Sequence, residues 1–478
     1  MKFKDIKFGY ISAEDEFTYS PELIIDGFLD AYGYIDELLN TEKFLVLGPK
    51  GSGKSAIGSK LELISKEKKE IFTKKFELRN FPYNNFTGII HSREAPEIQY
   101  SKNWEYVLMV ACLNSFINDS SFQYPKKGLV ILKTLVDSGL LSSEGKIKLD
   151  QIVKTTTDKK FEINLKAFKY ETSKQEEKIT NIEQLFIILE ELFYSIKLKS
   201  KHYIILDDLD YVFTERENQV KSLSALILAA DDMNKRFYQK EIPAKIIIMC
   251  RTDLFNKLSG PNKNKIKQHS GIILDWFQET SDLKNTNLAK LINLRTKLSL
   301  KTEIDIFQHC LPPDLYHRGM NRETLHVLFD YTRRTPRDII KLFNEIQKHT
   351  DNSTRPSKEN IKYALISYSK NYFIGEIRDE LYGFIEDYEI NNIIPLLISV
   401  GKYRFHETEL KEVIKSNDKY KSIDYNRLIN ALFNCNAVGQ VDNSTNFVTF
   451  KYRNPYAEYN PNKDILVHNG LQKALNLS

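Results

Sequence analysis

The feature that most constrains this chain is an eight-residue loop at residues 48–55, with the sequence Gly-Pro-Lys-Gly-Ser-Gly-Lys-Ser. It follows the apolar run 43–47 and precedes an amphipathic stretch at about 54–68, so we expect it to join a buried strand to a helix. Its glycines allow a tight turn in which backbone N–H groups point at phosphate oxygens, and the helix adds its positive N-terminal end. The loop therefore predicts a phosphate-binding site.

The residues of this loop have distinct expected roles. Lys54 is expected to reach the β- and γ-phosphates of a nucleotide, and the hydroxyl of Ser55 is expected to ligate Mg²⁺. A chance glycine turn is the alternative, but the strand, the helix and all four fixed positions of G-x-x-x-x-G-K-[ST] occur together. The predicted nucleotide-binding residues are Gly48, Pro49, Lys50, Gly51, Ser52, Gly53, Lys54, Ser55 and Ala56.

A second buried run, residues 203–206, ends in the acids Asp207, Asp208 and Asp210. Carboxylates at the C-terminal end of a parallel strand lie where ligands bind in open α/β sheets. We expect Asp207 to hold Mg²⁺, directly or through water, and Asp208 to polarise the attacking water. An acidic turn that caps a helix is the alternative, and for Asp210 we leave open a supporting role or a cap.

Two arginines complete the candidate site. Arg251 follows the apolar run 245–249, and its planar guanidinium suits phosphate oxygens; a structural ion pair is the alternative. Asp253 is expected to cap the turn that follows. Arg337 follows Pro336, which fits the first turn of a helix, so Arg337 opposes the helix dipole and a bound triphosphate would compensate it. A solvated basic turn is the alternative for Arg337.

The first zone of the chain, residues 1–275, alternates short β-branched runs with long helical stretches. Continuous apolar strands between helices are typical of a parallel sheet with helices on both faces, so we predict an α/β fold. Residues 70–180 are expected to be an elaborated insertion, and its lysine-rich part 119–180 has no clear periodicity. The helices expected in this zone lie at about 54–68, 103–118, 182–198 and 217–238.

Two further zones follow. Residues 276–372 show one helical pattern after another without strands, including 324–331 and 337–348, and we predict a helical lid. Residues 373–478 place helical segments near 376–400, 407–416 and 424–436 before the alternating run 447–452. Three helices followed by a hairpin is the order of a winged helix, which we predict for this zone.

Composition narrows the function classes. The chain has 478 residues with 69 Lys plus Arg against 64 Asp plus Glu, a net charge of +5 that neither requires nor excludes a nucleic-acid partner. No apolar run approaches the roughly 20 residues of a membrane-spanning helix, and no secretory signal is visible. Four widely spaced cysteines disfavour a disulfide framework or a zinc site. We therefore expect a cytoplasmic protein.

Taken together, these residues resemble the AAA+ and STAND branches of P-loop ATPases. Residues 48–55 match Walker A, and residues 204–208 match Walker B. Arg251 stands where STAND proteins carry a sensor-1 arginine, and Arg337 where AAA+ proteins carry a sensor-2 arginine. The resemblance implies an ASCE-type P-loop NTPase domain with a helical lid and a winged helix, ATP and Mg²⁺ as cofactors, and Lys54, Asp208, Arg251 and Arg337 as catalytic residues.

The whole chain also resembles a family of bacterial P-loop ATPases that share the GPKGSGKSA loop, the LDDLD strand and the RTD strand. AAA+ ATPases usually place Glu after the Walker B Asp, whereas this chain has Asp208, as many STAND proteins do. The shorter side chain favours a slow switch over a fast motor. No arginine finger from a neighbouring subunit can be identified.

The resemblance implies an ATPase that oligomerises with ATP and acts through an effector protein, in bacterial anti-phage defence or DNA-linked regulation. A DNA-binding ATPase in DNA maintenance and a P-loop phosphotransferase are the alternatives. The C-terminal zone is expected to contact DNA or protein. If it contacts DNA, the predicted phosphate contacts are Arg427, Lys451 and Arg453.

Overall fold

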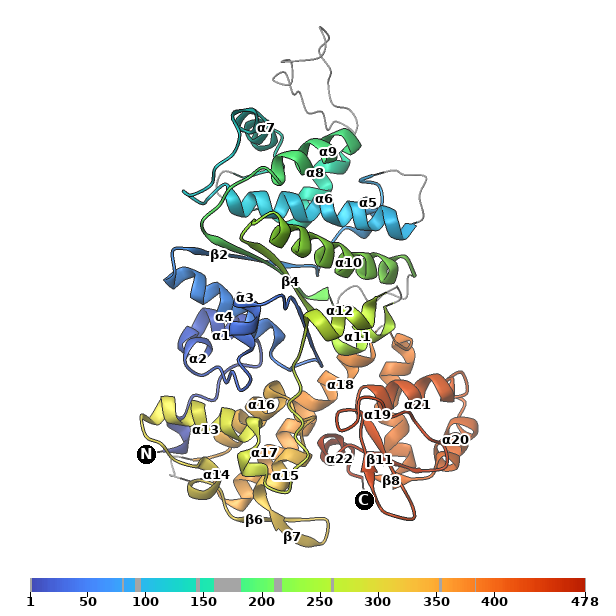
Figure 1. Cartoon of the computed structure of the whole chain (residues 1–478). Helices are drawn as coiled ribbons and strands as arrows, with labels where there is room; N and C mark the ends of the chain where they lie inside the picture. The colour runs from blue at the N-terminus through green and yellow to red at the C-terminus, as the bar shows by residue number, and fades with distance from the viewer. Residues whose placement is uncertain are drawn as a thin grey trace. The chain divides into compact units, whose positions relative to one another are not determined.

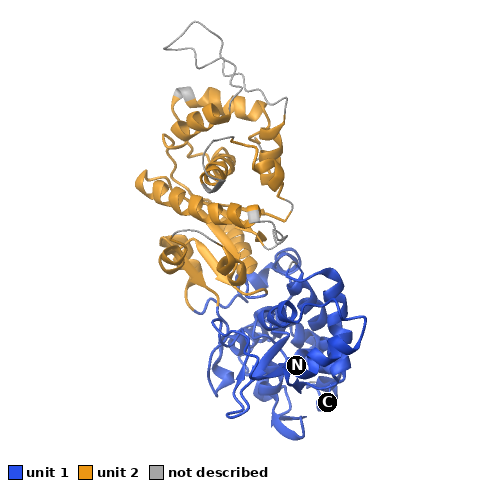
Figure 2. Ribbon diagram, turned by 90° about the vertical axis from the view of Figure 1, so that its right-hand side faces the viewer, with its two compact units in different colours: residues 1–31, 51–53, 275–478 blue, residues 32–50, 54–274 orange. Residues whose placement is uncertain are grey.

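The computed structural model describes residues 2–79, 81–90, 96–142, 147–158, 182–209, 217–258, 262–351, 355–382 and 384–477. The chain divides into two compact units (Figure 2). Unit 2 comprises Tyr32–Lys50 and Lys54–Leu274. Unit 1 comprises Met1–Ala31, Gly51–Gly53 and Asp275–Ser478. The middle of the phosphate loop is thus grouped with the C-terminal zones, and the predicted division into three domains stays a prediction.

Unit 2 is built on a parallel five-stranded sheet with the order β2–β3–β4–β1–β5 (Figure 1). Strand β4 lies between β1, which leads into the phosphate loop, and β3, which ends in Asp207. An additional strand between these two strands is characteristic of ASCE-type P-loop NTPases. The predicted α/β fold class is therefore confirmed. The strands are β1 (Leu45–Gly48), β2 (Ile71–Glu77), β3 (Lys201–Asp207), β4 (Ala244–Arg251) and β5 (Gly271–Ile273).

One face of the sheet is covered by α3 (Tyr34–Asn40) and α4 (Lys54–Glu67) (Figure 1). A Cβ placed on Gly58 of α4 would lie 3.7 Å from Ile205 and 3.8 Å from Met249, so these strand residues face α4. The ammonium of Lys245 donates a hydrogen bond of 2.6 Å to the carbonyl oxygen of Leu38 in α3. Because side chains alternate along a strand, the odd-numbered residues of β3 and β4 point to this face.

The opposite face carries α6 (Pro96–Phe116) and α10 (Glu217–Gln239). Ile204, Ile246 and Ile248 point to this face and join these helices in one hydrophobic core. The indole N–H of Trp104 donates to the carbonyl oxygen of Ser222 at 2.8 Å and links the two helices. Two short helices, α11 (Thr252–Lys257) and α12 (Lys263–Ser270), lead from β4 to β5.

The sequence pattern located β1, β3 and β4 but missed two strands. β2 is interrupted by Lys74 and Lys75, which break the continuous apolar character expected of a buried strand. β5 has only three residues, too few for a periodicity to show. Both missed strands are the outermost strands of the sheet, where local pattern is weakest.

The predicted insertion contributes helices to the core of unit 2. These are α6, α5 (Tyr83–Phe86), α7 (Lys126–Asp137) and α8 (Leu149–Thr157). The helix expected at 182–198, after the insertion, is α9 (Ile182–Phe193). At the start of β3, the buried His202 lies between Ser115 and Asp119, with Nδ1 2.8 Å from the Ser115 hydroxyl and Nε2 3.2 Å from the Asp119 carboxylate. Burial lowers the pKa of His202 to about 4 despite Asp119. Residues 143–146 and 159–181 of this segment lie outside the described residues.

In unit 1 the N-terminal segment packs against α13 (Asn287–Leu300). The buried guanidinium of Arg295 donates to the carbonyl oxygen of Phe8 and pairs with the buried carboxylate of Glu16. Gly9 lies between them with φ +112, and a Cβ there would lie 1.8 Å from Arg295 Nη1. The segment contains η1 (Phe3–Asp5), α1 (Ala13–Tyr19) and α2 (Pro21–Ile25). Nothing local in the sequence indicated this long-range association.

The zone predicted as a helical lid is mostly helical, but the prediction that it lacks strands is wrong. A hairpin of β6 (Asp314–His317) and β7 (Met320–Glu323) lies within it. Its strands have four residues each and mix polar with apolar side chains, so they are too short for a periodicity to reveal them. The helical elements are η4 (Leu283–Asn285), α13, α14 (Ile306–His309), α15 (Thr324–Asp330), α16 (Pro336–Lys348) and α17 (Lys358–Tyr368).

From α17 the chain continues without a break through the π-helical η5 (Ser369–Phe373) into α18 (Ile374–Leu381). The predicted boundary between residues 372 and 373 lies inside this helical stretch. The hydroxyl of Ser369 donates to the carbonyl oxygen of Gly470 at 2.5 Å, at the start of α22 (Asn469–Leu475). The π-helical turn therefore ties the C-terminal helix to the helical zone, and one core cluster includes both.

The C-terminal zone combines helices with a small antiparallel sheet of order β10–β9–β11–β8. Its elements are α19 (Asp387–Val400), β8 (Arg404–Phe405), α20 (Glu407–Ser416), α21 (Tyr425–Asn434), β9 (Val438–Val441), β10 (Val448–Thr449) and β11 (Asp464–Val467). Only residues 448–449 of the predicted run 447–452 are a strand. The winged-helix assignment stays a prediction. Across the described ranges, no helix has the length and apolar character needed to span a membrane.

Candidate functional site

The phosphate loop has the backbone that its glycines allow. Gly51 and Gly53 adopt positive φ values of +79 and +96, a region that other residues rarely occupy. The hydroxyl of Ser52 is buried, and the described residues offer it no hydrogen-bond partner. A buried, unpaired hydroxyl is costly unless a ligand satisfies it, so Ser52 fits a site for phosphate oxygens.

Lys54 and Ser55 open α4 directly after the loop. The buried ammonium of Lys54 donates to the carbonyl oxygens of Gly48 at 3.1 Å and Pro49 at 3.0 Å. The side chain of Lys54 therefore extends back toward the first two residues of the phosphate loop. Ala56 follows in the first turn of α4. These placements agree with the roles predicted for the loop, which stay predictions.

Asp207 ends β3 and is 3% exposed. Its Oδ1 accepts a hydrogen bond from the backbone N–H of Asp208 at 2.9 Å. Its Oδ2 lies 3.2 Å from Nζ of Lys75 on the neighbouring strand β2, yet lacks an aligned hydrogen bond among the described residues. A buried carboxylate oxygen with lone pairs left over suits a metal ligand, so Asp207 fits the predicted Mg²⁺ site.

Asp208 has a positive φ of +57, which Asp tolerates better than most residues. Its Oδ2 lies 3.3 Å from the guanidinium of Arg79, directly after β2. The carboxylate predicted to polarise water is therefore held by a partly exposed ion pair. Asp210 lies outside the described residues.

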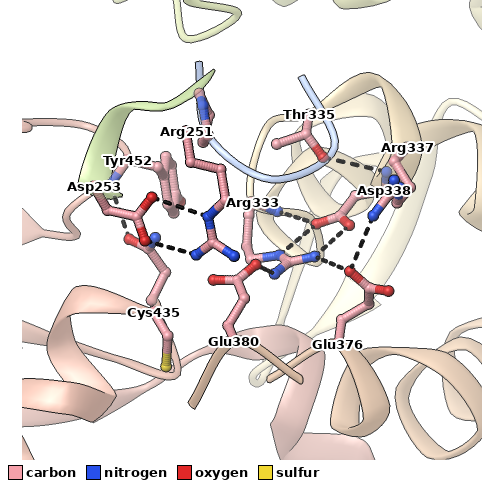
Figure 3. A network of polar contacts seen from close by, with 12 residues as sticks. Arg251, Asp253, Arg333, Thr335, Arg337, Asp338, Glu376, Glu380, Cys435 and Tyr452 are labelled. Atoms are coloured by element: carbon pink, nitrogen blue, oxygen red, sulfur yellow. Dashed lines mark hydrogen bonds and ion pairs between the residues drawn. The ribbon is translucent and has the colours of Figure 1, made fainter. Parts of the chain in front are cut away.

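Arg251 is the last residue of β4 and is buried. Its guanidinium forks onto the carboxylate of Asp253, with donor–acceptor distances of 3.0 and 2.6 Å (Figure 3). Burial alone would raise the pKa of Asp253, but Arg251, the backbone N–H of Leu254 and Lys54 hold it below its ordinary value. The geometry is the ion pair that we kept as the alternative for Arg251. For Arg251 to act as a sensor, its guanidinium would have to release Asp253 and bind a phosphate instead.

Arg337 belongs to unit 1, as do Gly51–Gly53. The helix α16 begins with Pro336 in the first turn, as the sequence predicted, and the hydroxyl of Thr335 is its N-cap. The backbone N–H of Arg337 donates to the carbonyl oxygen of Gly51 at 3.3 Å. Its Nε donates to the carbonyl oxygen of Ile11 at 3.0 Å, and its Nη1 lies 3.7 Å from Glu376. The expected compensation for a cation at a helix N-terminus is thus present within the protein.

Sequence reasoning missed the buried ion-pair network beside Arg337 (Figure 3). Arg333 is 4% exposed and binds Asp338 through its backbone N–H, Nε and Nη2 at 2.8–2.9 Å. It also pairs with Glu376 at 3.4 Å and with Glu380. Burial would raise the pKa of Asp338, but Arg333 and the Tyr372 hydroxyl lower it to about 2. An Arg and an Asp five residues apart around a helix start were the available signal.

Magnesium is usually held by one or two carboxylates together with substrate phosphates and water. Within the described ranges, no group of three or more His, Cys, Asp or Glu residues could hold a metal ion. Ser55 and Asp207 in unit 2 are therefore the residues that fit a Mg²⁺ whose other ligands come from a nucleotide.

The three cations predicted to contact DNA each have partners inside the protein. The guanidinium of Arg427 lies 2.8 Å from Glu389, and the ammonium of Lys451 donates to a backbone carbonyl oxygen at 2.7 Å. Arg453 lies 3.8 Å from Asp330 and over the ring of Tyr452. Arg427 is exposed, but all three cations already have partners within the protein, which weakens the expectation of a basic DNA-binding face.

Comparisons with known proteins relate parts of this chain to others. A family model described as the FunZ-associated C-terminal helical domain matches residues 286–374, from the N-cap of α13 to the first residue of α18. The chain is 22% identical over 510 residues to a putative transposon gamma-delta 80.3 kDa protein of Escherichia coli (strain K12), covering 99% of this chain and 68% of that protein.

Two solved structures are also similar in part. One is the Aeropyrum pernix Orc1 protein in complex with DNA, with a TM-score of 0.40 and 10% identity over 96% of this chain and 94% of that chain. The other is Cdc6p from Pyrobaculum aerophilum, with a TM-score of 0.32 and 11% identity over 98% and 95% of the two chains. At these scores the fold assignment rests on the sheet order and the phosphate loop.

Proposed function

We propose that this protein binds ATP with Mg²⁺ at residues 48–56 and hydrolyses it slowly, as a nucleotide-dependent switch. The observation that carries the proposal is the complete phosphate loop between β1 and α4, with the buried Ser52 hydroxyl lacking a partner among the described residues. The ASCE-type strand order supports it, because Asp207 then ends a strand that is separated from β1 only by β4.

The residues would divide the work as follows. The loop N–H groups and Lys54 would bind the phosphates, while Ser55 and Asp207 would hold the metal ion, which neutralises charge on the β- and γ-phosphates. Asp208 would orient the attacking water once it is released from Arg79. Its short side chain and its existing ion pair both favour slow turnover.

The proposal extends to the biological setting. We infer an effector protein as the partner, with oligomerisation in the ATP state, because the cations once expected to contact DNA are paired within the protein. The similarity to a putative transposon protein supports a setting linked to mobile DNA, either in defence against it or in DNA maintenance. ATP consumption without an added acceptor distinguishes this proposal from a phosphotransferase, which would consume ATP only when an acceptor is added.

The direct test is calorimetric titration with ATP and Mg²⁺. Lys54→Ala removes a charge-assisted contact worth about 1.5–3 kcal/mol, so affinity falls roughly 10- to 100-fold. Lys66→Ala, an exposed lysine in the last turn of the same helix, is the matched control and leaves affinity unchanged. Equal ATP affinity in the folded Lys54→Ala protein and the wild type would overturn the proposed function.

A further inference from the structure

A lysine is buried against the carboxylate proposed to hold the metal ion. Lys75 on β2 places Nζ 3.2 Å from Oδ2 of Asp207, and the two side chains are 9% and 4% exposed. Lysine is almost never this deeply buried unless it is paired. Burying the ammonium costs free energy unless a nearby carboxylate compensates it, and Asp207 is such a carboxylate.

The strand register directs Lys75 to the face covered by α4. In the parallel ladder Lys75 is opposite Ile205, so it points to the same side as Ile205 and Asp207. A Cβ on Gly58 would lie 3.9 Å from Lys75 Cδ, which places the lysine stem beneath α4. The ammonium therefore extends along the sheet to its carboxyl edge, where β3 ends and where α4 begins with Lys54 and Ser55.

The two oxygens of Asp207 differ in how firmly they are held. Oδ1 accepts an aligned hydrogen bond from the backbone N–H of Asp208. Oδ2 is near Lys75 without an aligned hydrogen bond. A buried carboxylate without a compensating cation is strongly disfavoured, and Lys75 supplies that compensation when no metal ion is present. The contact between Lys75 and Oδ2 is electrostatic and does not depend on a directed hydrogen bond, so another cation can take the place of the ammonium.

We propose that Lys75 is a resident cation that competes with Mg²⁺ for Asp207 and thereby sets how much Mg²⁺ the site requires. This inference rests on the proposed function, since it concerns the same metal site. In the nucleotide-free protein the ammonium balances the buried carboxylate. If Mg²⁺ were held by Asp207 together with a nucleotide, the ammonium would be displaced, because two cations beside one carboxylate repel each other.

A purely structural lysine predicts something different. If Lys75 only stabilised the sheet, its removal would lower thermal stability without changing the Mg²⁺ requirement. If it positioned Asp207 for the metal, its removal would raise the Mg²⁺ requirement. Competition alone predicts that the requirement falls when the charge is removed.

The test measures binding of a fluorescent ATP analogue at fixed concentration while Mg²⁺ is titrated. Lys75→Met keeps the length and apolar stem of the side chain but removes the charge, and the half-saturating Mg²⁺ concentration is expected to fall about tenfold. Lys75→Arg keeps a cation and is expected to match or exceed the wild-type value. The control Lys74→Met removes a charge from the same strand on its other face and leaves the value unchanged.

A second measurement does not depend on the binding signal. In EDTA without nucleotide, Lys75→Met is expected to melt below the wild type, and Mg²⁺ with ATP should raise its melting temperature by more than it raises that of the wild type. An unchanged or raised Mg²⁺ requirement in Lys75→Met overturns the proposal. If Lys75→Met does not fold, the proposal is overturned when Lys75→Arg requires less Mg²⁺ than the wild type. If the wild-type protein itself did not bind nucleotide, that result would instead refute the proposed function.

Discussion

The backbone N–H of Arg337 donates a hydrogen bond to the carbonyl oxygen of Gly51 across 3.3 Å. The first turn of α16 thereby contacts the phosphate loop within unit 1. The position is tight, because a Cβ on Gly51 would lie 3.0 Å from Cβ of Arg337. A loop that rearranges around phosphates must move against this helix start, and Glu376 on α18 shares its carboxylate between Arg337 and Arg333. This chain of contacts is the basis for the nucleotide sensing predicted below.

The two acids at the end of β3 should respond differently to substitution. Asp207→Asn is expected to weaken Mg²⁺-dependent ATP binding, because the amide is a poorer ligand for a hard cation. Asp208→Asn is expected to retain binding and slow turnover, the pattern of an interaction made mainly in the transition state. Calorimetry and a phosphate-release assay separate the two effects. Identical defects in both variants would show that their roles are wrongly divided.

Arg337 and Glu376 should have opposite effects on the preference for ATP over ADP. Arg337→Ala removes the proposed contact with the γ-phosphate, so the affinity ratio is expected to fall about tenfold. Glu376→Gln removes a competing partner of Arg337, and the ratio is expected to rise by a few fold, the effect of a partly exposed ion pair.

The matched control for this pair is Arg378→Ala, an exposed arginine on α18. The ratio of its affinity for ATP to its affinity for ADP should equal that of the wild type. A ratio that stays at the wild-type value in Arg337→Ala would remove the sensor assignment, whatever Glu376→Gln does.

The buried network around Arg333 should dominate the stability of unit 1. Asp338→Asn leaves Arg333 with only its carboxylate partners on α18 and is expected to cost about 3 kcal/mol of unfolding free energy. Glu303→Gln breaks an exposed pair with Lys297 and should change little. Urea unfolding of the two variants measures the difference, and equal midpoints would argue against the network as a stabilising element.

Stability should fall in mild acid partly through His202. Its pKa is lowered to about 4 because burial disfavours the cation, whereas an unfolded histidine titrates near 6.5. The unfolded chain therefore binds a proton between these values that the folded protein does not, and stability is lost as the pH falls through this window. Between pH 7 and pH 5 the expected loss from this residue is about 2 kcal/mol.

The measurement is the urea midpoint at pH 7 and pH 5 for wild type, His202→Gln and the exposed control His269→Gln. His317 and His468 are also buried with lowered pKa values and act in the same direction, so some pH dependence remains in every variant. A pH dependence in His202→Gln as steep as that of the wild type would exclude this contribution.

Local sequence was sufficient where the physical requirement is itself local. A tight loop that turns N–H groups inward needs glycines at fixed positions, and a strand before it and a helix after it show their own periodicities. The start of α16 was equally predictable, since Pro336 favours the first turn of a helix through its own backbone angle. The long helices α4 and α10 were located within a few residues for the same reason.

Tertiary structure decided which charges meet. The sequence pattern indicated no role for Lys75, because only the register between β2 and β3 places its ammonium beside Asp207. Arg295 and Glu16 meet although nothing near either in the sequence predicts it, because α13 packs on the N-terminal segment. The glycine loop and the buried strands β1, β3 and β4 follow from short-range sterics and apolar patterning that the sequence by itself determines. The partners of buried charges follow from the cost of removing them from water, which is set only when distant segments are packed together.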